Sequence, residues 1–175
     1  MNLPNILSFS RILLLIPIIF LFEFEFYLLS VGIFIAASIT DYLDGYFARR
    51  NNTATESGAL LDLLADKIFI SSLLIWITFK IDNIFILISS ILIISREISI
   101  SYLRLFVISQ KRKISELKSD FTGKIKTTFQ MIGLGFILIS PITPNFIFNL
   151  SISLILFSAI ISWYSFIRYL NKWIV

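Results

Sequence analysis

The sequence predicts an all-α integral membrane protein: a bundle of six transmembrane helices with both termini in the cytoplasm. Of its 175 residues, 57% are apolar and 15% are charged, whereas about 25% of a soluble domain is charged. Apolar windows close to the roughly 20 residues that cross a bilayer recur along the chain. Basic residues gather at one set of the connections between these windows. We expect one compact domain over residues 1–175.

Each apolar window predicts one helix, because backbone groups in lipid must find partners within their own segment. The windows cover roughly residues 5–22, 28–49, 58–79, 83–109, 122–140 and 146–168. The opening turns of the first, around Pro4, are expected in the membrane interface. This window does not resemble a secretory signal, because Arg11 interrupts the apolar run and no small-residue cleavage site follows.

The second and third windows meet in a strongly charged stretch, "DYLDGYFARRNNTATESGALLDLLADK", residues 41–67. The last three windows are joined by the polar segment 110–121 and by the short "SPITPN". We expect segment 110–121 to lie on the membrane surface, with Ile114 and Leu117 toward the lipid. Internal repeats and low-complexity linkers are not found.

Basic residues predict the orientation of the bundle. One set of connections and the C-terminus carry Arg49, Arg50, Lys111, Arg112, Lys113, Lys118, Arg168 and Lys172. The opposite connections carry Lys80 with Glu23, Glu25 and Asp82. The formal net charge of +4 is therefore interpreted as a topology signal that also attracts anionic lipid headgroups, and no nucleic-acid partner is expected.

The chain contains no cysteine and no histidine. Disulfides, thiolate chemistry, histidine bases and the usual zinc sites are thereby excluded. A bound metal would have to be held by oxygen ligands, which favours Mg²⁺, Mn²⁺ or Ca²⁺.

Four aspartates lie where two predicted membrane helices meet. Asp41 and Asp44 are three residues apart and Asp62 and Asp66 are four apart, so each pair shares one helix face. An antiparallel hairpin would bring both pairs together near the cytoplasmic surface. Each ionised carboxylate costs about 2.5–3.5 kcal/mol at mid-membrane, so a compensating partner is expected. Facing carboxylates form an oxygen-rich cage that suits one or two Mg²⁺ or Mn²⁺ ions.

Small residues between the aspartates leave room for a ligand beside the backbone. Gly45, Ala48 and Gly58 supply this groove, and Arg49 could contact a phosphate or another carboxylate. The alternatives are ordinary ones: interhelical hydrogen bonds from single aspartates, and ion pairs of Arg49 or Lys67 with neighbouring carboxylates. Two helix-spaced pairs favour the metal site over these alternatives.

The same residues match the pattern D-x2-D-G-x2-A-R-x8-G-x3-D-x3-D at every fixed position. In this the chain resembles the CDP-alcohol phosphatidyltransferase family. The resemblance implies a six-helix, usually dimeric membrane enzyme that uses two divalent ions and moves a phosphatidyl group from a CDP-linked lipid to a hydroxyl acceptor, releasing CMP. It also implies that Asp41, Asp44 and Asp62 bind metal, that Asp66 is both ligand and general base, and that Gly45, Ala48, Arg49 and Gly58 contact the CDP group.

Three further stretches, "NLPNILSFSRILLLIPIIF", "SREISISYLR" and "GKIKTTFQMIG", look like a bacterial branch of the family. That likeness implies an inner-membrane enzyme whose site faces the cytoplasm, with CDP-diacylglycerol as donor and sn-glycerol 3-phosphate as acceptor. Attack by the acceptor hydroxyl, deprotonated by Asp66, on the β-phosphorus of the donor would complete the reaction.

A phosphorylated acceptor needs cations near the same cavity. Arg96, Arg104, Lys124 and Lys126 are the candidates, because charge-assisted hydrogen bonds hold phosphate well. Glu97 could orient Arg96 or pair with Arg104, and Thr127 and Gln130 could line the pocket. The two lysines could instead be surface anchors, and for Arg11 the anchor role is favoured over contact with this pocket.

Two other functions are considered. The same chemistry with phosphatidylglycerol, serine or inositol phosphate as acceptor is the nearer one, and the four basic residues favour a phosphorylated acceptor. The other is a cation-coupled transporter. Broken helices and paired halves would favour it, and neither is found in the sequence.

Overall fold

The structure is a computed structural model that describes residues 3–50, 56–109 and 121–174. Six α-helices and one 3-10 helix make up the described chain: α1 Leu3–Glu23, α2 Tyr27–Arg50, α3 Glu56–Lys80, α4 Ile84–Ser109, α5 Phe121–Ile139, η2 Ser140–Ile142 and α6 Asn145–Ile174. The predicted all-helical class and the number of helices are confirmed. The predicted surface segment 110–121 lies outside the described residues except for its last residue, which begins α5.

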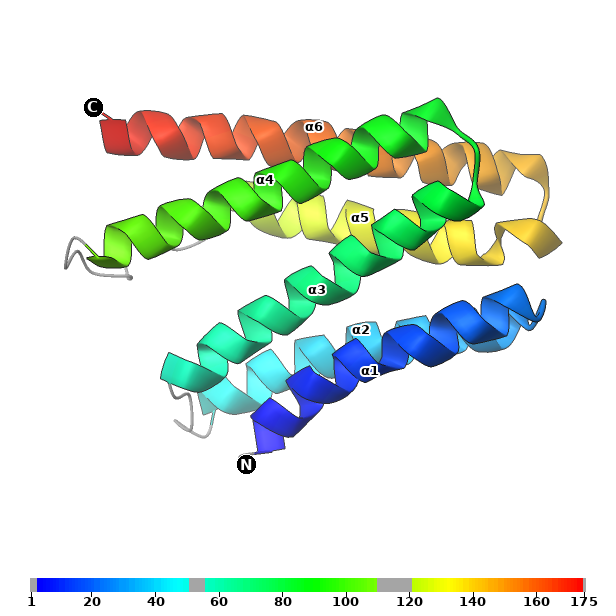
Figure 1. Cartoon of the computed structure of the whole chain (residues 1–175), viewed down its shortest axis with the longest axis horizontal. Helices are drawn as coiled ribbons and strands as arrows, with labels where there is room; N and C mark the ends of the chain where they lie inside the picture. The colour runs from blue at the N-terminus through cyan, green and yellow to red at the C-terminus, as the bar shows by residue number, and fades with distance from the viewer. Residues whose placement is uncertain (1–2, 51–55, 110–120, 175) are drawn as a thin grey trace.

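The six helices form two groups of three (Figure 1). In the first group α1 packs on both α2 and α3, and in the second α6 packs on both α4 and α5. Contacts between α2 and α5 and between α3 and α4 join the groups. The interior of the bundle is therefore formed by helices from both halves of the chain.

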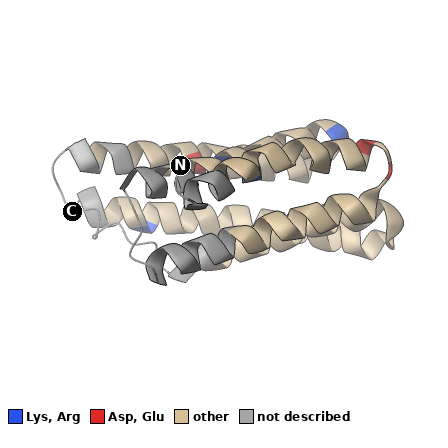
Figure 2. Ribbon diagram, turned by 90° about the horizontal axis from the view of Figure 1, so that it is seen from below, with Lys and Arg blue, Asp and Glu red and all other residues tan. Residues whose placement is uncertain are grey.

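Both termini lie at the same end of the bundle (Figure 1). The connections 24–26, 81–83 and 140–144 lie at the opposite end, where Figure 2 shows charged residues at the tips of otherwise mostly uncharged helices. There, Nζ of Lys80 donates a 2.6 Å hydrogen bond to Glu23, and this bond lowers the pKa of the Glu23 carboxyl. This arrangement fits the predicted placement of the termini on one side; which side of the membrane that is remains a prediction.

The outer surface of the bundle carries many large apolar side chains. Phe79, Phe146 and Leu28 are 89%, 69% and 68% exposed, which in water would be unfavourable but suits contact with lipid tails. Three described helical segments are long and apolar enough to cross a membrane: Ile84–Leu103, Ile125–Ile142 and Asn145–Asn171. A membrane protein is thereby supported, while the predicted six-span count stays a prediction.

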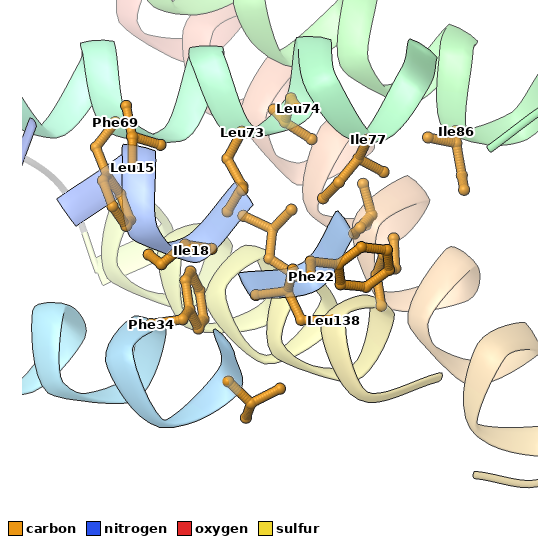
Figure 3. Packing of buried hydrophobic residues seen from close by; sticks show 14 of the residues in the cluster. Leu15, Ile18, Phe22, Phe34, Phe69, Leu73, Leu74, Ile77, Ile86 and Leu138 are labelled. Carbon is orange, nitrogen blue, oxygen red and sulfur yellow. The ribbon is translucent and has the colours of Figure 1, made fainter. Parts of the chain in front are cut away.

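The core lies where the two helix groups meet. Figure 3 shows Ile18 of α1, Phe34 of α2, Phe69 and Leu73 of α3 and Leu138 of α5 directed into it. Since lipid is as apolar as leucine, such cores are held mainly by close packing and by hydrogen bonds between helices. Ser158 of α6, for example, donates to a carbonyl of α5 at 3.0 Å. This packing positions the polar groups described next.

Candidate functional site

Asp66 on α3 is held by an arginine from α1. Its Oδ1 accepts a 3.2 Å hydrogen bond from Nη1 of Arg11, and its side chain is 40% exposed. Arg11 is only 1% exposed. The favoured role of Arg11 as an interface anchor is therefore wrong, because α1 directs this guanidinium into the bundle, where the aspartate of α3 compensates its charge.

Asp66 also lines a cavity of about 330 Å³ between α2, α3 and α5. Among the described residues, its wall is formed by Ser38, Asp66, Ile70, Thr127, Thr128, Gln130, Met131 and Ile132. The sequence suggested Thr127 and Gln130 as pocket residues, and the structure places both beside the same cavity as Asp66. Hydroxyl, amide and carboxylate groups alternate with apolar side chains, as in sites for ligands that have polar and apolar parts.

A second polar feature, here called the Glu97 cluster, consists of Lys67, Arg96, Glu97 and Lys126. Nη1 of Arg96 donates to Oε1 of Glu97 at 2.8 Å, and Nζ of Lys126 donates to the same oxygen. Nζ of Lys67 lies 3.7 Å from Oε2 of Glu97. One carboxylate on α4 thus contacts cations from α3, α4 and α5.

Two of the predicted acceptor residues, Arg96 and Lys126, are brought together in this cluster. Both are buried, at 7% and 5% exposure, so the alternative of Lys126 as a surface anchor is wrong. Nε of Arg96 also donates to the carbonyl of Ser162 on α6 at 3.3 Å. These contacts hold the guanidinium in place within the bundle.

The Glu97 cluster and the cavity are neighbours. Asp66, in the cavity wall, and Lys67, in the cluster, are consecutive on α3. Lys126, in the cluster, directly precedes Thr127, in the cavity wall, on α5. α3 and α5 therefore each supply one residue to the cavity wall and the next or preceding residue to the cluster, so the two features lie close together along both helices.

The remaining predicted site residues have side chains outside the described part of the structure. They are Asp41, Asp44, Gly45, Ala48, Arg49, Gly58, Asp62, Arg104 and Lys124. Their backbones lie in helices, with residues 41–50 ending α2 and residues 56–66 beginning α3. The connecting residues 51–55 can span roughly 20 Å at most, so the ends of α2 and α3 lie within that distance of each other.

The chemistry of the donor set fits a hard divalent ion. With no cysteine or histidine in the chain, the four aspartates offer only oxygen, which Mg²⁺ and Mn²⁺ prefer. Asp66 is partly exposed at a cavity wall, as a ligand to such an ion would need to be. Among the described side chains no group of three or more potential metal ligands is assembled, since Asp41, Asp44 and Asp62 are not among them.

The sequence did not predict the partners of Lys67 and Arg11. For Glu97 it predicted the contact with Arg96 but not those with Lys67 and Lys126. Lys67 follows Asp66 directly and so lies off the aspartate face of the helix, which removes it from any same-face pattern. Its partner Glu97 is 30 residues away, and Arg11 is 55 residues from Asp66. The available signal was the presence of charged side chains within apolar windows, which marks functional positions in membrane proteins.

Comparison with known proteins identifies the family of this chain. A family model described as CDP-alcohol phosphatidyltransferase matches residues 1–167. A protein of Salmonella choleraesuis (strain SC-B67), named CDP-diacylglycerol–glycerol-3-phosphate 3-phosphatidyltransferase, is 32% identical over 97% of this chain and 93% of its own length. Proteins of the same name from Shigella flexneri serotype 5b and Escherichia coli K12 are also 32% identical, with the same coverage. The chain belongs to the CDP-alcohol phosphatidyltransferase family.

Proposed function

We propose that this protein transfers the phosphatidyl group of CDP-diacylglycerol to sn-glycerol 3-phosphate, giving phosphatidylglycerophosphate and CMP. The relatives that match 97% of the chain carry the name of this reaction. The structural observation that carries the proposal is the position of Asp66, in a cavity wall and directly before Lys67 of the Glu97 cluster.

In this proposal Asp66 is the general base. The acceptor hydroxyl gives its proton to the carboxylate and its oxygen bonds to the phosphorus that bears the diacylglycerol group. The bond from that phosphorus to the bridging oxygen breaks, and CMP leaves with the electron pair. The hydrogen bond from Arg11 fixes the carboxylate's orientation toward the cavity, which matters because a base must lie within hydrogen-bond reach of the proton it takes.

Asp41, Asp44, Asp62 and Asp66 would hold the divalent ions, Mg²⁺ or Mn²⁺. Bound there, such ions supply positive charge for the donor's diphosphate and the departing phosphate. Gly45, Ala48 and Gly58 leave space for the CDP group and Arg49 contacts its phosphates. Arg96, Arg104, Lys124 and Lys126 receive the phosphate of the acceptor.

The proposed setting is the bacterial inner membrane, with the site facing the cytoplasm and the protein a homodimer. The lipid donor then enters sideways from the bilayer, and the water-soluble acceptor enters from the cytoplasm. The apolar outer surface supports the first route, because large hydrophobic side chains are exposed along the helices.

An acceptor screen tests the proposal directly. Purified protein is given CDP-diacylglycerol with Mg²⁺ or Mn²⁺ and one alcohol at a time: glycerol 3-phosphate, phosphatidylglycerol, serine or inositol phosphate. We expect CMP release with glycerol 3-phosphate, and loss of turnover in Asp66→Asn with CDP-lipid binding retained. Asn keeps the size of the side chain but cannot take the proton.

Other outcomes would overturn separate parts of the proposal. Turnover with a different alcohol alone would keep the family and reject the acceptor. Full turnover in Asp66→Asn would reject the general base. Absence of CMP release with every acceptor would reject the transferase reaction and favour a transport function.

A further inference from the structure

We infer that Glu97 is a positioning residue, which gathers Lys67, Arg96 and Lys126 into one binding site for the phosphate of the acceptor, and that Lys67 is a phosphate-binding residue of this site. The inference rests on the proposed function and extends it to two residues that take no part in the aspartate signature. It starts from the contacts of Glu97.

Glu97 is the shared partner of three cations that come from three helices. Its Oε1 accepts from Arg96 at 2.8 Å and from Lys126, while its Oε2 lies 3.7 Å from Nζ of Lys67. The side chains of all four residues are at most 20% exposed. Cations repel one another strongly where water is scarce, so without this carboxylate the three groups would move apart.

The ammonium group of Lys67 has several partners on α4. Its Nζ donates to the carbonyl of Glu97 at 3.2 Å and to Oγ of Ser101, and Ser101 in turn donates to the same carbonyl at 2.6 Å. One turn of α4 therefore holds the lysine of α3 through a carboxylate, a carbonyl and a hydroxyl. Such a network keeps a flexible side chain in one geometry, as a preorganised site requires.

The place of the cluster matches the shape of the acceptor. A small phosphorylated alcohol carries a hydroxyl at one end and a phosphate with about −1.5 to −2 charges at the other. Asp66 and Thr127 line the cavity, and their chain neighbours Lys67 and Lys126 belong to the Glu97 cluster, so the cavity and the cluster lie close together along α3 and α5. A ligand with its hydroxyl at Asp66 would present its phosphate to the Glu97 cluster, where three cations can donate charge-assisted hydrogen bonds.

A purely structural role is the competing explanation: Glu97 would simply tie α3, α4 and α5 together. The two roles differ in kinetics. A tie that supports the fold affects the free energy of unfolding and both substrates alike. A positioning residue for the phosphate site affects the KM for the acceptor without an equal effect on the KM for the lipid donor.

The experiment measures both KM values and the thermal midpoint for Glu97→Gln and Lys67→Gln. We expect the KM for glycerol 3-phosphate to rise about tenfold or more in each variant, the loss typical of a hydrogen bond to a charged group, with the KM for CDP-diacylglycerol within about twofold. Lys67→Arg keeps the positive charge and should restore part of the affinity. Glu23→Gln is the matched control, because it removes the same charge from an interhelical pair with Lys80 at the other end of the bundle, and it should leave both KM values unchanged.

Failure of this inference is distinguishable from failure of the proposed function. If the unaltered protein releases CMP with glycerol 3-phosphate while both Gln variants keep its KM for the acceptor, Glu97 and Lys67 have no role in phosphate binding. Equal rises in both KM values together with a lower thermal midpoint would assign them a structural role. If Glu97→Gln does not fold, Lys67→Gln decides alone. A protein without CMP release refutes the proposed function itself.

Discussion

Arg11 and Asp66 form the closest link between the interior of the bundle and the proposed chemistry. A guanidinium that is 1% exposed would be very unfavourable in a membrane protein without a compensating group. Asp66 supplies such a group, and at the same time its carboxylate gains a fixed orientation at the cavity wall. Asp66 thus compensates the charge of Arg11, and Arg11 orients the carboxylate of Asp66. This pairing accounts for an arginine within the first apolar helix.

Replacement of Arg11 by Met should lower kcat by about a hundredfold, because a misplaced catalytic group commonly costs that much. The KM for glycerol 3-phosphate should change little, since Arg11 contacts the base and not the cations of the Glu97 cluster. Arg11→Lys, which keeps a positive charge, should recover part of kcat. Steady-state kinetics of the detergent-purified variants measure both values.

Loss of stability must be separated from loss of chemistry in this test, because the replacement also removes a buried guanidinium and its ion pair with Asp66. The matched control is Arg168→Met, at an exposed arginine of α6 whose guanidinium lies 6.0 Å from the ring centre of Tyr164. It should change neither kcat nor the thermal midpoint appreciably. An Arg11→Met protein with a lower midpoint but unchanged kcat at a temperature where it is folded would reject the positioning of Asp66 by Arg11.

At the scale of residues, the sequence predicted what lies on one helix and missed what lies between helices. Spacing alone placed Asp62 and Asp66 on one face, and apolar surroundings marked Arg96 as unusual. Neither kind of pattern reveals that Lys67 reaches α4 or that Arg11 reaches α3, because these partners depend on how helices pack. The metal cage itself stays a prediction, since three of its four side chains are outside the described residues.

At the scale of elements, hydropathy predicted the helices well and their ends less well. The second window, 28–49, and α2, Tyr27–Arg50, nearly coincide. The last window was expected to end near 168, yet α6 continues to Ile174, because a helix can extend into water beyond the apolar part that hydropathy detects. The 3-10 helix η2 was not predicted. It contains Pro141, which cannot donate the backbone hydrogen bond that would continue α5.

The pairing of α5 with α6 depends on a glycine. A Cβ at Gly133 would lie 2.6 Å from Cγ1 of Ile155, 3.3 Å from the carbonyl oxygen of Ser151 and 3.4 Å from the backbone nitrogen of Ile155. The side chain of Ile155 is stiff because it is β-branched, and the other two atoms belong to the backbone of α6. Gly133 therefore permits the close approach of the two helices, as small residues do in membrane bundles.

Gly133→Ala should destabilise the protein by about 1–3 kcal/mol, the usual cost of overpacking. Gly135→Ala is the matched control on the same helix, because its Cβ would meet Phe34 at an ordinary 3.6 Å and alanine is the better helix former. Thermal unfolding in detergent should show a lower midpoint for the first variant and an equal or higher one for the second. Equal midpoints in both variants would contradict the close packing of α5 on α6 at this position.

At the scale of the whole molecule, polar groups are distributed unevenly along the bundle. The opposite end from the termini holds Glu23, Lys80 and Asp82, tied by the Glu23–Lys80 pair. The end with the termini receives the C-terminal turns of α2 and the N-terminal turns of α3, which carry the aspartate signature. The positions of lysine and arginine in the sequence predicted this asymmetry, because their numbers differ between the two sets of connections. It follows that the aspartates of the signature and the termini should face the same compartment.

The absence of native cysteine makes this orientation measurable with single introduced thiols. Asn171, exposed near the C-terminal end of α6, and Asp82, exposed in the connection between α3 and α4, are replaced by Cys one at a time. In spheroplasts, a membrane-impermeant maleimide should label Asp82→Cys and not Asn171→Cys, and permeabilisation should expose both, because the excess of basic residues keeps the termini inside. Ile98→Cys, at a residue that is 66% exposed within the apolar segment Ile84–Leu103 of α4, should stay unlabelled in both conditions, since a thiol in lipid does not ionise. Labelling of Asn171→Cys in intact spheroplasts would place the termini outside and separate the aspartates from a cytoplasmic acceptor, which the proposed reaction does not permit.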